Sequence, residues 1–357
     1  MYINKMGKEK KRNKNFPLVS VCTPTFNRRP FIPIIIKCFE NQSYPKDRIE
    51  WIIVDDGSDN VEDLFINVPQ VKYFRFEEKM TLGKKRNFLN EKAKGDIIIY
   101  MDDDDYYPPD RISHAVETLQ NSPTALCAGS SSMFIYFKHI NKMLLFGPYG
   151  PNHATAATFA FKKELLKITK FDENSSVAEE RKFLKDYTIP FVQLESSKSI
   201  LVFSHNHNSF DKKELLTQMP NPHVHETEMK PSDIVKEPEI LNFFINDINS
   251  LLDLYEPGKP KYKPDVIKQI AEIKEQRDNM IKQQMANQNN LQGLSNPQFI
   301  QNTMNQQVFM IQQLTTENKQ LKEKNQYLES KIKQIIDEKI KEKIQEKKIL
   351  SESNTKC

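Results

Sequence analysis

The chain has 357 residues, of which 52 are lysine or arginine and 48 are aspartate or glutamate, so its formal net charge is +4. Only 38% of the residues are hydrophobic and 28% are charged, which predicts that part of the chain lies outside a buried core. The positive excess sits in residues 1–16 and 308–357, whereas residues 17–307 are slightly acidic. This distribution excludes a basic nucleic-acid platform for the globular part.

The cysteines and the apolar runs indicate the cellular compartment. Cys22, Cys38, Cys127 and Cys357 are scattered without a C-x-x-C pair, which excludes a disulfide scaffold and a zinc cluster and favours a reducing environment. No run approaches the roughly 18 apolar residues of a membrane-spanning helix, and residues 1–16 lack the apolar segment of a secretory signal. We therefore expect a cytoplasmic protein without a membrane span.

The first half of the chain alternates short β-branched runs with amphipathic stretches. This alternation predicts an α/β fold whose mostly parallel sheet is covered by helices on both faces. Further along, two apolar runs flank Asn141 and predict a β-hairpin. In chain order, strands are expected over 18–23, 50–56, 71–76, 96–101, 125–137 and 142–146, and helices over 30–42, 82–95 and 108–120.

The C-terminal part differs in composition from the rest. Residues 211–282 are interpreted as a helical extension or linker, and residues 283–307, about half of them Gln or Asn, as a flexible linker. Residues 308–350 carry heptads and predict a parallel, dimeric coiled coil, with a solitary charged helix as the alternative. Residues 1–16 are interpreted as a basic disordered arm. The heptad positions are Ile311, Asn318, Asn325 and Ile332 at a, and Leu314, Leu321, Leu328 and Ile335 at d.

Two acidic turns follow Ile-rich strands. Four adjacent aspartates occupy 102–105, and Asp55 and Asp56 precede Gly57. Because the carboxyl ends of parallel strands meet at one edge of a sheet, both turns are expected in the same crevice. Adjacent carboxylates repel one another, and Mg²⁺ or Mn²⁺, which prefer oxygen ligands, would relieve that repulsion. The alternative for 102–105 is an exposed acidic turn without a ligand.

Three collinear motifs carry a family resemblance. They read VSVCTPTFNRRPFI from Val19, WIIVDDGSDN from Trp51, and LGKKRNFLNEKAKGDIIIYMDDDDYYPPDRI from Leu82 to Ile112. This part of the chain resembles the GT-A-fold glycosyltransferases of family 2, and the resemblance continues more faintly to about residue 210. It implies a GT-A enzyme domain over 17–210, with a Rossmann-like sheet. Glycosyltransferases of large DNA viruses look similar, and the abundant Lys, Asn and Ile suggest an AT-rich genome.

The resemblance also implies a UDP-sugar donor and a Mn²⁺ or Mg²⁺ cofactor. It identifies Asp104 as the acid that binds the metal, with Asp102 beside it in the D-x-D pattern. His207, followed by Asn208-Ser209, resembles a family loop that supplies a further ligand, and His205 is left open. The donor-binding residues carried over are Thr23, Pro24, Thr25, Asp55, Asp56, Arg86, Asp102 and Asp103.

Inverting enzymes of this family need a general base, which is usually the Asp of a Glu-Asp pair. Here Glu180 takes that position with Glu179 before it, and the open alternative is that both are first-turn acids of a helix. His153 and Thr155 are candidates for the acceptor side, where the resemblance implies a glycan or protein hydroxyl.

The resulting prediction is a metal-dependent inverting hexosyl- or N-acetylhexosaminyltransferase. A rival from another class is a catalytically degenerate binding module on a coiled-coil scaffold. A nucleotidyltransferase is disfavoured because no Gly-rich phosphate loop opens the chain.

Overall fold

The computed structural model describes residues 16–217, 221–292, 308, 311–312, 314–326 and 328–333. The chain up to Lys274 forms one compact unit, and the chain from Glu275 forms a second. Residues 1–15 of the predicted basic arm and residues 293–307 of the predicted Gln/Asn-rich linker lie outside the described residues.

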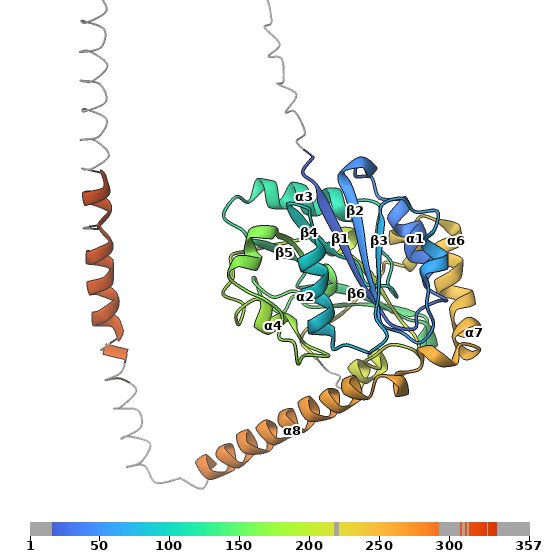
Figure 1. Ribbon diagram of the computed structural model, residues 1–357. Helices are drawn as coiled ribbons and strands as arrows, with labels where there is room; N and C mark the ends of the chain where they lie inside the picture. Colours follow the sequence, from blue (N-terminus) through green and yellow to red (C-terminus); the bar gives the residue numbers. More distant parts are fainter. Residues whose placement is uncertain are drawn as a thin grey trace, which may run out of the picture. The chain divides into compact units, whose positions relative to one another are not determined.

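The strands of the described residues form two sheets (Figure 1). The larger has the order β3-β2-β1-β4-β8-β5-β9, and the smaller has the order β10-β6-β7-β11. The strands are β1 Val19–Thr25, β2 Ile49–Asp55, β3 Val71–Arg75, β4 Ile97–Tyr100, β5 Cys127–Gly129, β6 Met133–Phe137, β7 Lys142–Phe146, β8 Ala160–Lys162, β9 Phe191–Gln193, β10 Leu201–Ser204 and β11 Val224–Glu226.

The larger sheet brings the two acidic turns to one edge. β1 pairs in parallel with both β2 and β4, and β2 pairs in parallel with β3. The residues that follow β2 and β4 therefore emerge on the same side, as expected for parallel strands. β8 runs antiparallel between β4 and β5, so the sheet as a whole is mixed.

Helices cover both faces of this sheet (Figure 1). α1 and α3 pack on one face with Val21, Trp51 and Ile53, while α2 packs on the other with Cys22 and Ile52. This division follows from the alternation of side chains along each strand. The helices are α1 Ile32–Glu40, α2 Leu82–Lys92, α3 Arg111–Asn121, α4 Glu180–Phe183, α5 Pro231–Ile234, α6 Pro238–Asn242, α7 Ile248–Asp253 and α8 Pro264–Gln292, with a π-helical turn over Phe243–Asp247.

The single tryptophan of the sequence, Trp51, lies at the centre of the α1 face. Its ring stacks on Phe39 with the centroids 4.4 Å apart, and Phe65 meets it edge-on at 5.4 Å. The indole Nε1 donates a hydrogen bond of 2.9 Å to Thr23 Oγ1 in the neighbouring strand. The hydrogen bond satisfies the only polar atom of a fully buried side chain.

A buried arginine joins α3 to the sheet. Arg111 is fully buried, and its guanidinium donates to three backbone carbonyls, those of Tyr100, Thr158 and Phe159. Burial lowers the pKa of Arg111 to about 10, which still leaves the group charged at neutral pH. The end of β4 is therefore tied to the segment that leads into β8.

The predicted strand over 125–137 divides between the two sheets. Cys127–Gly129 becomes β5 in the larger sheet, and Met133–Phe137 becomes β6 in the smaller one. Between them stand three serines, which offer no apolar side chains to continue a buried strand. The predicted hairpin is confirmed, since β6 and β7 pair antiparallel around Asn141, whose φ is +48°.

The compact unit continues well past residue 210, the predicted end of the enzyme domain. Phe243, Phe244, Ile248 and Leu252 are buried in the same core as α1. The ring of Phe244 stacks on Phe203 of β10 with the centroids 4.0 Å apart. Much of the segment interpreted as a helical extension thus contributes apolar side chains to the compact unit.

The coiled coil remains a prediction. Residues 314–326 are helical. Residues 334–350 of the predicted coiled coil lie outside the described part of the chain. The described apolar heptad residues are all exposed, and they are Ile311, Leu314, Leu321, Leu328 and Ile332.

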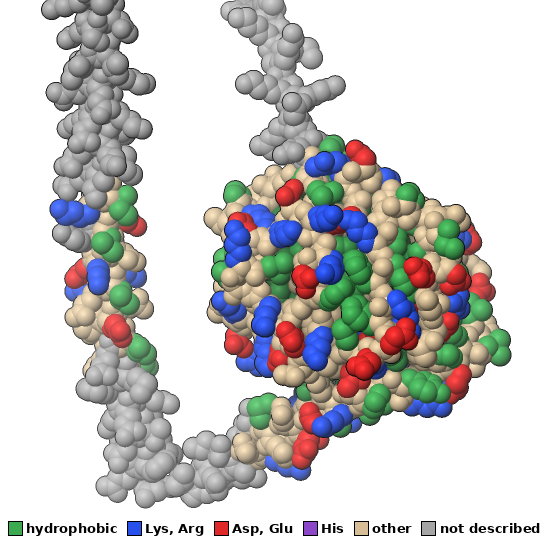
Figure 2. Space-filling view, viewed as in Figure 1, with side chains coloured by type: hydrophobic (Ala, Val, Ile, Leu, Met, Phe, Trp, Pro, Cys, Tyr) green, Lys and Arg blue, Asp and Glu red, His purple; other side chains and the backbone are tan. Residues whose placement is uncertain are grey.

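The described surface adds two observations. None of the described helices is both long enough and apolar enough to cross a membrane. On the face of the compact unit drawn in Figure 2, basic and acidic side chains are interspersed. That face therefore lacks the single-sign patch that polyanion binding needs.

Candidate functional site

The four aspartates at 102–105 form a turn directly after β4. Asp103 and Asp105 are buried, and Asp102 and Asp104 are partly exposed. The turn is held by Tyr107, whose hydroxyl accepts a 2.7 Å hydrogen bond from the Asp102 N–H. The same hydroxyl donates to a backbone carbonyl of the segment before β8. The acids are therefore presented by a rigid turn at the carboxyl edge of the sheet.

Arg28 neutralises part of this acidic turn. Its Nε lies 3.5 Å from Asp103 Oδ1, and its Nη2 lies 3.2 Å from Asp104 Oδ2. Burial raises the pKa of Asp104, but Arg28 and His205 outweigh that effect and hold it well below its usual range. Burial and the charge of Asp104 raise the pKa of Asp103 to about 6, against the opposing effect of Arg28. Asp104 is thus the carboxylate of the turn that is most firmly ionised.

His205 is the histidine that faces Asp104. Its Nε2 lies 3.5 Å from Asp104 Oδ2, and its Nδ1 accepts a hydrogen bond from the His207 N–H. Burial lowers the pKa of His205 to about 4, so the ring is neutral at neutral pH. The predicted metal ligand His207 points its buried Nδ1 toward Gly258, and that nitrogen has no hydrogen-bond partner among the described residues.

Arg86 links the acidic turn to the predicted base region. Its Nε donates a 2.7 Å hydrogen bond to Glu179 Oε1, and its Nη2 lies 3.5 Å from Asp102 Oδ1. The guanidinium also lies over the ring of Tyr100, 4.5 Å from its centroid. Both Arg86 and Glu179 are buried and form an internal ion pair, while the buried Nη1 of Arg86 has no hydrogen-bond partner among the described residues.

Glu180 opens α4 beside this pair and behaves differently from Glu179. It is partly exposed and forms no ion pair with a described residue, although Arg86 and Asp102 are near enough to influence it. Burial and the adjacent charge of Glu179 raise the pKa of Glu180 to about 7. A carboxyl group poised near neutral pH can accept a proton from a substrate hydroxyl.

The residues predicted to bind the nucleotide base lie in the last part of β1 and directly after β2. Asp56 forms an ion pair with Lys85 and accepts a 2.6 Å hydrogen bond from the Met80 N–H. Lys85 also donates to the backbone carbonyl of Thr25, so it ties the end of β1 to Asp56. Asp56 and Thr25 are therefore close together at the sheet edge.

Three other predicted donor residues are used by the fold itself. Asp55 accepts hydrogen bonds from the Tyr73 hydroxyl and the Gly57 N–H. Thr23 donates to the carbonyl of Met101, and Pro24 lies within β1, paired with β2. These side chains hold the strands in place beside the site.

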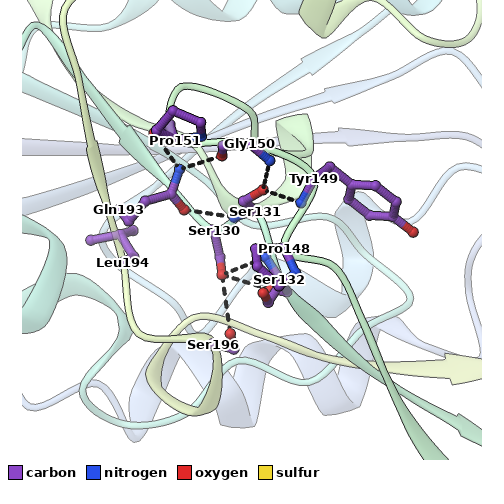
Figure 3. A pocket seen from close by; sticks show the side chains of 10 residues that line it. All are labelled: Ser130, Ser131, Ser132, Pro148, Tyr149, Gly150, Pro151, Gln193, Leu194 and Ser196. Atoms are coloured by element: carbon purple, nitrogen blue, oxygen red, sulfur yellow. Dashed lines mark hydrogen bonds between the residues drawn. The ribbon is translucent and has the colours of Figure 1, made fainter. Parts of the chain in front are cut away.

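A pocket of about 450 Å³ lies further along the same edge (Figure 3). Ser131 Oγ accepts hydrogen bonds from the N–H groups of Tyr149 and Gly150, and the Gln193 side chain bridges Ser131 to Pro151. The pocket is lined by Ser130, Ser131, Ser132, Pro148, Tyr149, Gly150, Pro151, Gln193, Leu194 and Ser196.

A row of rings connects this pocket to the region of Glu180. Tyr149 contacts His153 with the centroids 5.1 Å apart, and His153 contacts Tyr187 at 5.2 Å. Tyr187 follows α4, which Glu180 opens, and the charge of Glu180 contributes to raising the pKa of Tyr187. Of the two predicted acceptor residues, His153 lies in this row of rings. The other, Thr155, accepts a hydrogen bond from the Thr158 hydroxyl through its backbone carbonyl.

Sequence reasoning missed Arg28, Lys85 and Tyr107. Each lies within one of the three quoted motifs, so their positions in those motifs could have marked them as candidates. Their partners, however, are distant in sequence: Asp104 lies 76 residues from Arg28, and Thr25 lies 60 residues from Lys85, so only the folded chain shows the contacts.

Comparisons with known proteins agree on one family. The sequence profile described as "Glycosyl transferase family 2" matches residues 20–171. An uncharacterized glycosyltransferase of Haemophilus influenzae is 27% identical over 211 residues, which is 55% of this chain and 79% of that protein. The putative colanic acid biosynthesis glycosyl transferase WcaA of Escherichia coli is 35% identical over 105 residues, or 28% of this chain and 37% of that protein.

Solved structures give a weaker likeness. The mannosyltransferase PcManGT from Pyrobaculum calidifontis, in complex with GDP-Man and Mn²⁺, has 20% identity and a TM-score of 0.44. That match covers 53% of this chain and 57% of the other. TarS 1–349 of S. aureus, in complex with UDP-GlcNAc, has 20% identity and a TM-score of 0.39, covering 52% of this chain and 58% of the other.

Proposed function

We propose that this chain is a metal-dependent inverting enzyme of glycosyltransferase family 2, whose profile matches residues 20–171, and that it transfers a sugar from a UDP-sugar to a hydroxyl group. The observation that supports this most strongly is the link through Arg86. It brings the acidic turn after β4 next to a glutamate pair in which Glu180 has a pKa of about 7. A nucleotide-sugar transferase needs both parts, a cation-binding edge and a base beside it.

The acids of the turn fit a divalent cation. Asp104 is ionised, and the buried Oδ1 of Asp102 has no hydrogen-bond partner among the described residues. No three His, Cys, Asp or Glu side chains in the described part of the chain are grouped as a metal site. Mg²⁺ and Mn²⁺ are commonly bound by one or two carboxylates plus water and substrate phosphates. When bound, the cation would neutralise charge on the diphosphate leaving group.

Glu180 is the base in this proposal. Its carboxylate takes the proton of the acceptor hydroxyl as that oxygen bonds to the anomeric carbon of the sugar. The bond from the anomeric carbon to the diphosphate oxygen breaks at the same time, and UDP leaves with the electron pair. Arg86 holds Glu179 and orients the start of α4, so it positions the base.

The acceptor is proposed to be a glycan. The pocket behind Tyr149 presents serine hydroxyls and an amide, which suit sugar hydroxyl groups. The rings of Tyr149, His153 and Tyr187 lead from it toward Glu180, and aromatic faces suit the apolar C–H faces of sugars.

A UDP-release assay tests the proposed function. We expect the chain with Mn²⁺ and a panel of UDP-sugars and oligosaccharides to release UDP, and we expect EDTA to stop it. Asp104→Ala should abolish release, while Asp47→Ala, a substitution on an exposed turn, should not. Binding of a UDP-sugar with no release from any acceptor would instead support the degenerate binding module.

A further inference from the structure

A segment outside the family-matched region crosses the edge where the acidic turns lie. We call residues 255–269 the strap. At its start, the Tyr255 hydroxyl donates a 2.7 Å hydrogen bond to Asp59 Oδ2, in the turn after β2. Asn27 Nδ2 then donates to the Pro257 carbonyl at 2.9 Å. The beginning of the strap is therefore attached to the loops that follow β1 and β2.

The end of the strap is attached to residues that precede α2 and Glu179. Asp265 forms an ion pair with Lys79 and accepts a 2.6 Å hydrogen bond from Ser176 Oγ. Gln269 accepts from the Ser176 N–H and donates to the Asn174 carbonyl. Ser176 lies just before Glu179, so the strap runs from the nucleotide side of the edge to the base side.

Between these anchors the strap lies very close to the site. A Cβ at Gly258 would be 2.6 Å from His207 Nδ1 and 3.0 Å from the Asn27 carbonyl. The Gly258 carbonyl also lies 3.4 Å from Nη1 of Arg28, the residue that contacts the acidic turn. A side chain at this position would push the strap away from Arg28.

Lys263 extends from the strap toward Phe26 and Ser209. Its Nζ donates a 2.8 Å hydrogen bond to Ser209 Oγ and lies 5.7 Å from the ring centroid of Phe26. Burial and the nearby Arg28 lower the pKa of Lys263 to about 7, while Asp103 and Asp104 act in the opposite direction. No carboxylate of the described residues forms an ion pair with Lys263, so the partners of its amino group are neutral: the Ser209 hydroxyl and the ring of Phe26.

An ammonium group in this setting suits an anion. A partly buried charge with only neutral partners is unfavourable unless an oppositely charged group joins it. The acids within electrostatic range, Asp103 and Asp104, are already contacted by Arg28. A diphosphate placed beside Asp104 would supply that anion, because its oxygens accept charge-assisted hydrogen bonds from ammonium groups.

We propose that the strap completes the donor site and that Lys263 binds the diphosphate of the nucleotide donor, an inference that rests on the proposed function. The donor site is then shared between the family-matched residues 20–171 and a segment about 90 residues beyond them. The strap supplies affinity for the diphosphate and none for the nucleoside.

Calorimetric titration of the full chain with UDP and with uridine, both in Mn²⁺, tests this proposal. We expect Lys263→Met to raise the dissociation constant for UDP by about 10- to 100-fold, the range for loss of one charge-assisted hydrogen bond. The constant for uridine should stay unchanged. The matched control is Lys261→Met, on an exposed strap lysine paired with Glu256, which should leave both constants unchanged.

Two further variants distinguish the loss of the Lys263 contact from a loss of the folded state. Lys263→Arg keeps the charge and should recover most of the affinity for UDP. Gly258→Val should lift the strap and weaken UDP binding as Lys263→Met does, with thermal unfolding showing that the fold persists. Unchanged or tighter UDP binding by Lys263→Met would overturn the proposal, the tighter case indicating that the strap blocks the site. A wild-type chain that binds neither uridine nor UDP would contradict the proposed function itself.

Discussion

Replacing Glu180 by glutamine is expected to abolish sugar transfer while making the folded chain more stable above neutral pH. The pKa of Glu180 rises from an ordinary 4.5 to about 7 because burial and Glu179 disfavour its charged form. A carboxyl group whose folded pKa is raised binds its proton more tightly in the folded state. Its contribution to stability is present below about pH 4.5 and is lost as the pH rises to about 7.

The size of this effect follows from the shift. The rise of the pKa from 4.5 to about 7 corresponds to a cost of roughly 3 kcal/mol for ionising Glu180 in the folded state. Because Glu180 is partly exposed, solvent screening reduces this cost to about 1–2 kcal/mol. Glu180→Gln should therefore raise the free energy of unfolding by about that amount at about pH 8 and by little at about pH 5. Urea denaturation at both pH values measures it.

The activity of the wild-type chain should increase with pH, whereas the contribution of Glu180 to its stability decreases with pH. A general base works only when ionised, so the wild-type rate of UDP release should rise with pH through about 7. Glu180→Gln should lower that rate by about 10²- to 10⁴-fold at about pH 8, and by less below pH 7, where the wild-type carboxyl group is itself mostly protonated. Glu180→Asp, which restores the residue usual in the family, should retain part of the activity.

The neighbouring glutamate provides the matched control. Glu179→Gln removes the partner of the buried Arg86 and should lower the free energy of unfolding by about 3–5 kcal/mol. If Glu179→Gln proved the stabilising change and Glu180→Gln the damaging one, the assignment of roles within the pair would be refuted. Full activity in Glu180→Gln would refute the base assignment by itself.

Two other predictions concern the core. Arg111→Met leaves three backbone carbonyls without their guanidinium donor and should lower the free energy of unfolding by about 2–4 kcal/mol in urea denaturation, whereas a change below about 0.5 kcal/mol would contradict the role given to Arg111. Burial raises the pKa of the thiols of Cys22, Cys38 and Cys127 well above the usual range. In a Cys357→Ser chain we therefore expect no maleimide labelling of the native protein and complete labelling in urea; labelling of the native protein at the rate of the unfolded chain would show that the thiols are accessible.

The parts of the fold that the sequence predicts are those set by local patterns. The strands that become β2 and β4 are Ile-rich runs ended by acids, and parallel pairing places those ends together. The division of residues 125–137 between two sheets depends on which strands they meet, and no local pattern encodes that. The same holds for residues 243–252, whose apolar side chains join a core formed by α1 about 200 residues earlier.

The candidate site likewise has parts that the sequence predicts and parts that only the folded chain shows. The acids at 102–105 and the glutamate pair are visible as motifs, and their order along the chain identifies them. Which glutamate Arg86 contacts, and which histidine faces Asp104, depends on distances of a few ångström between distant segments. Arg28 is the clearest example, since its partners include carbonyls of residues 207 and 258.

Trp51 has a practical consequence for all of these experiments. It is the only tryptophan of the chain, so the tryptophan fluorescence of the protein reports from a single point on β2. Its Nε1 is hydrogen-bonded to Thr23, in the strand that leads to the nucleotide side of the site. Unfolding exposes the ring to water and should shift its emission to longer wavelength, and a donor that moves β1 should change its intensity. The protein thus contains a built-in optical reporter for both stability and donor binding, and no label has to be added.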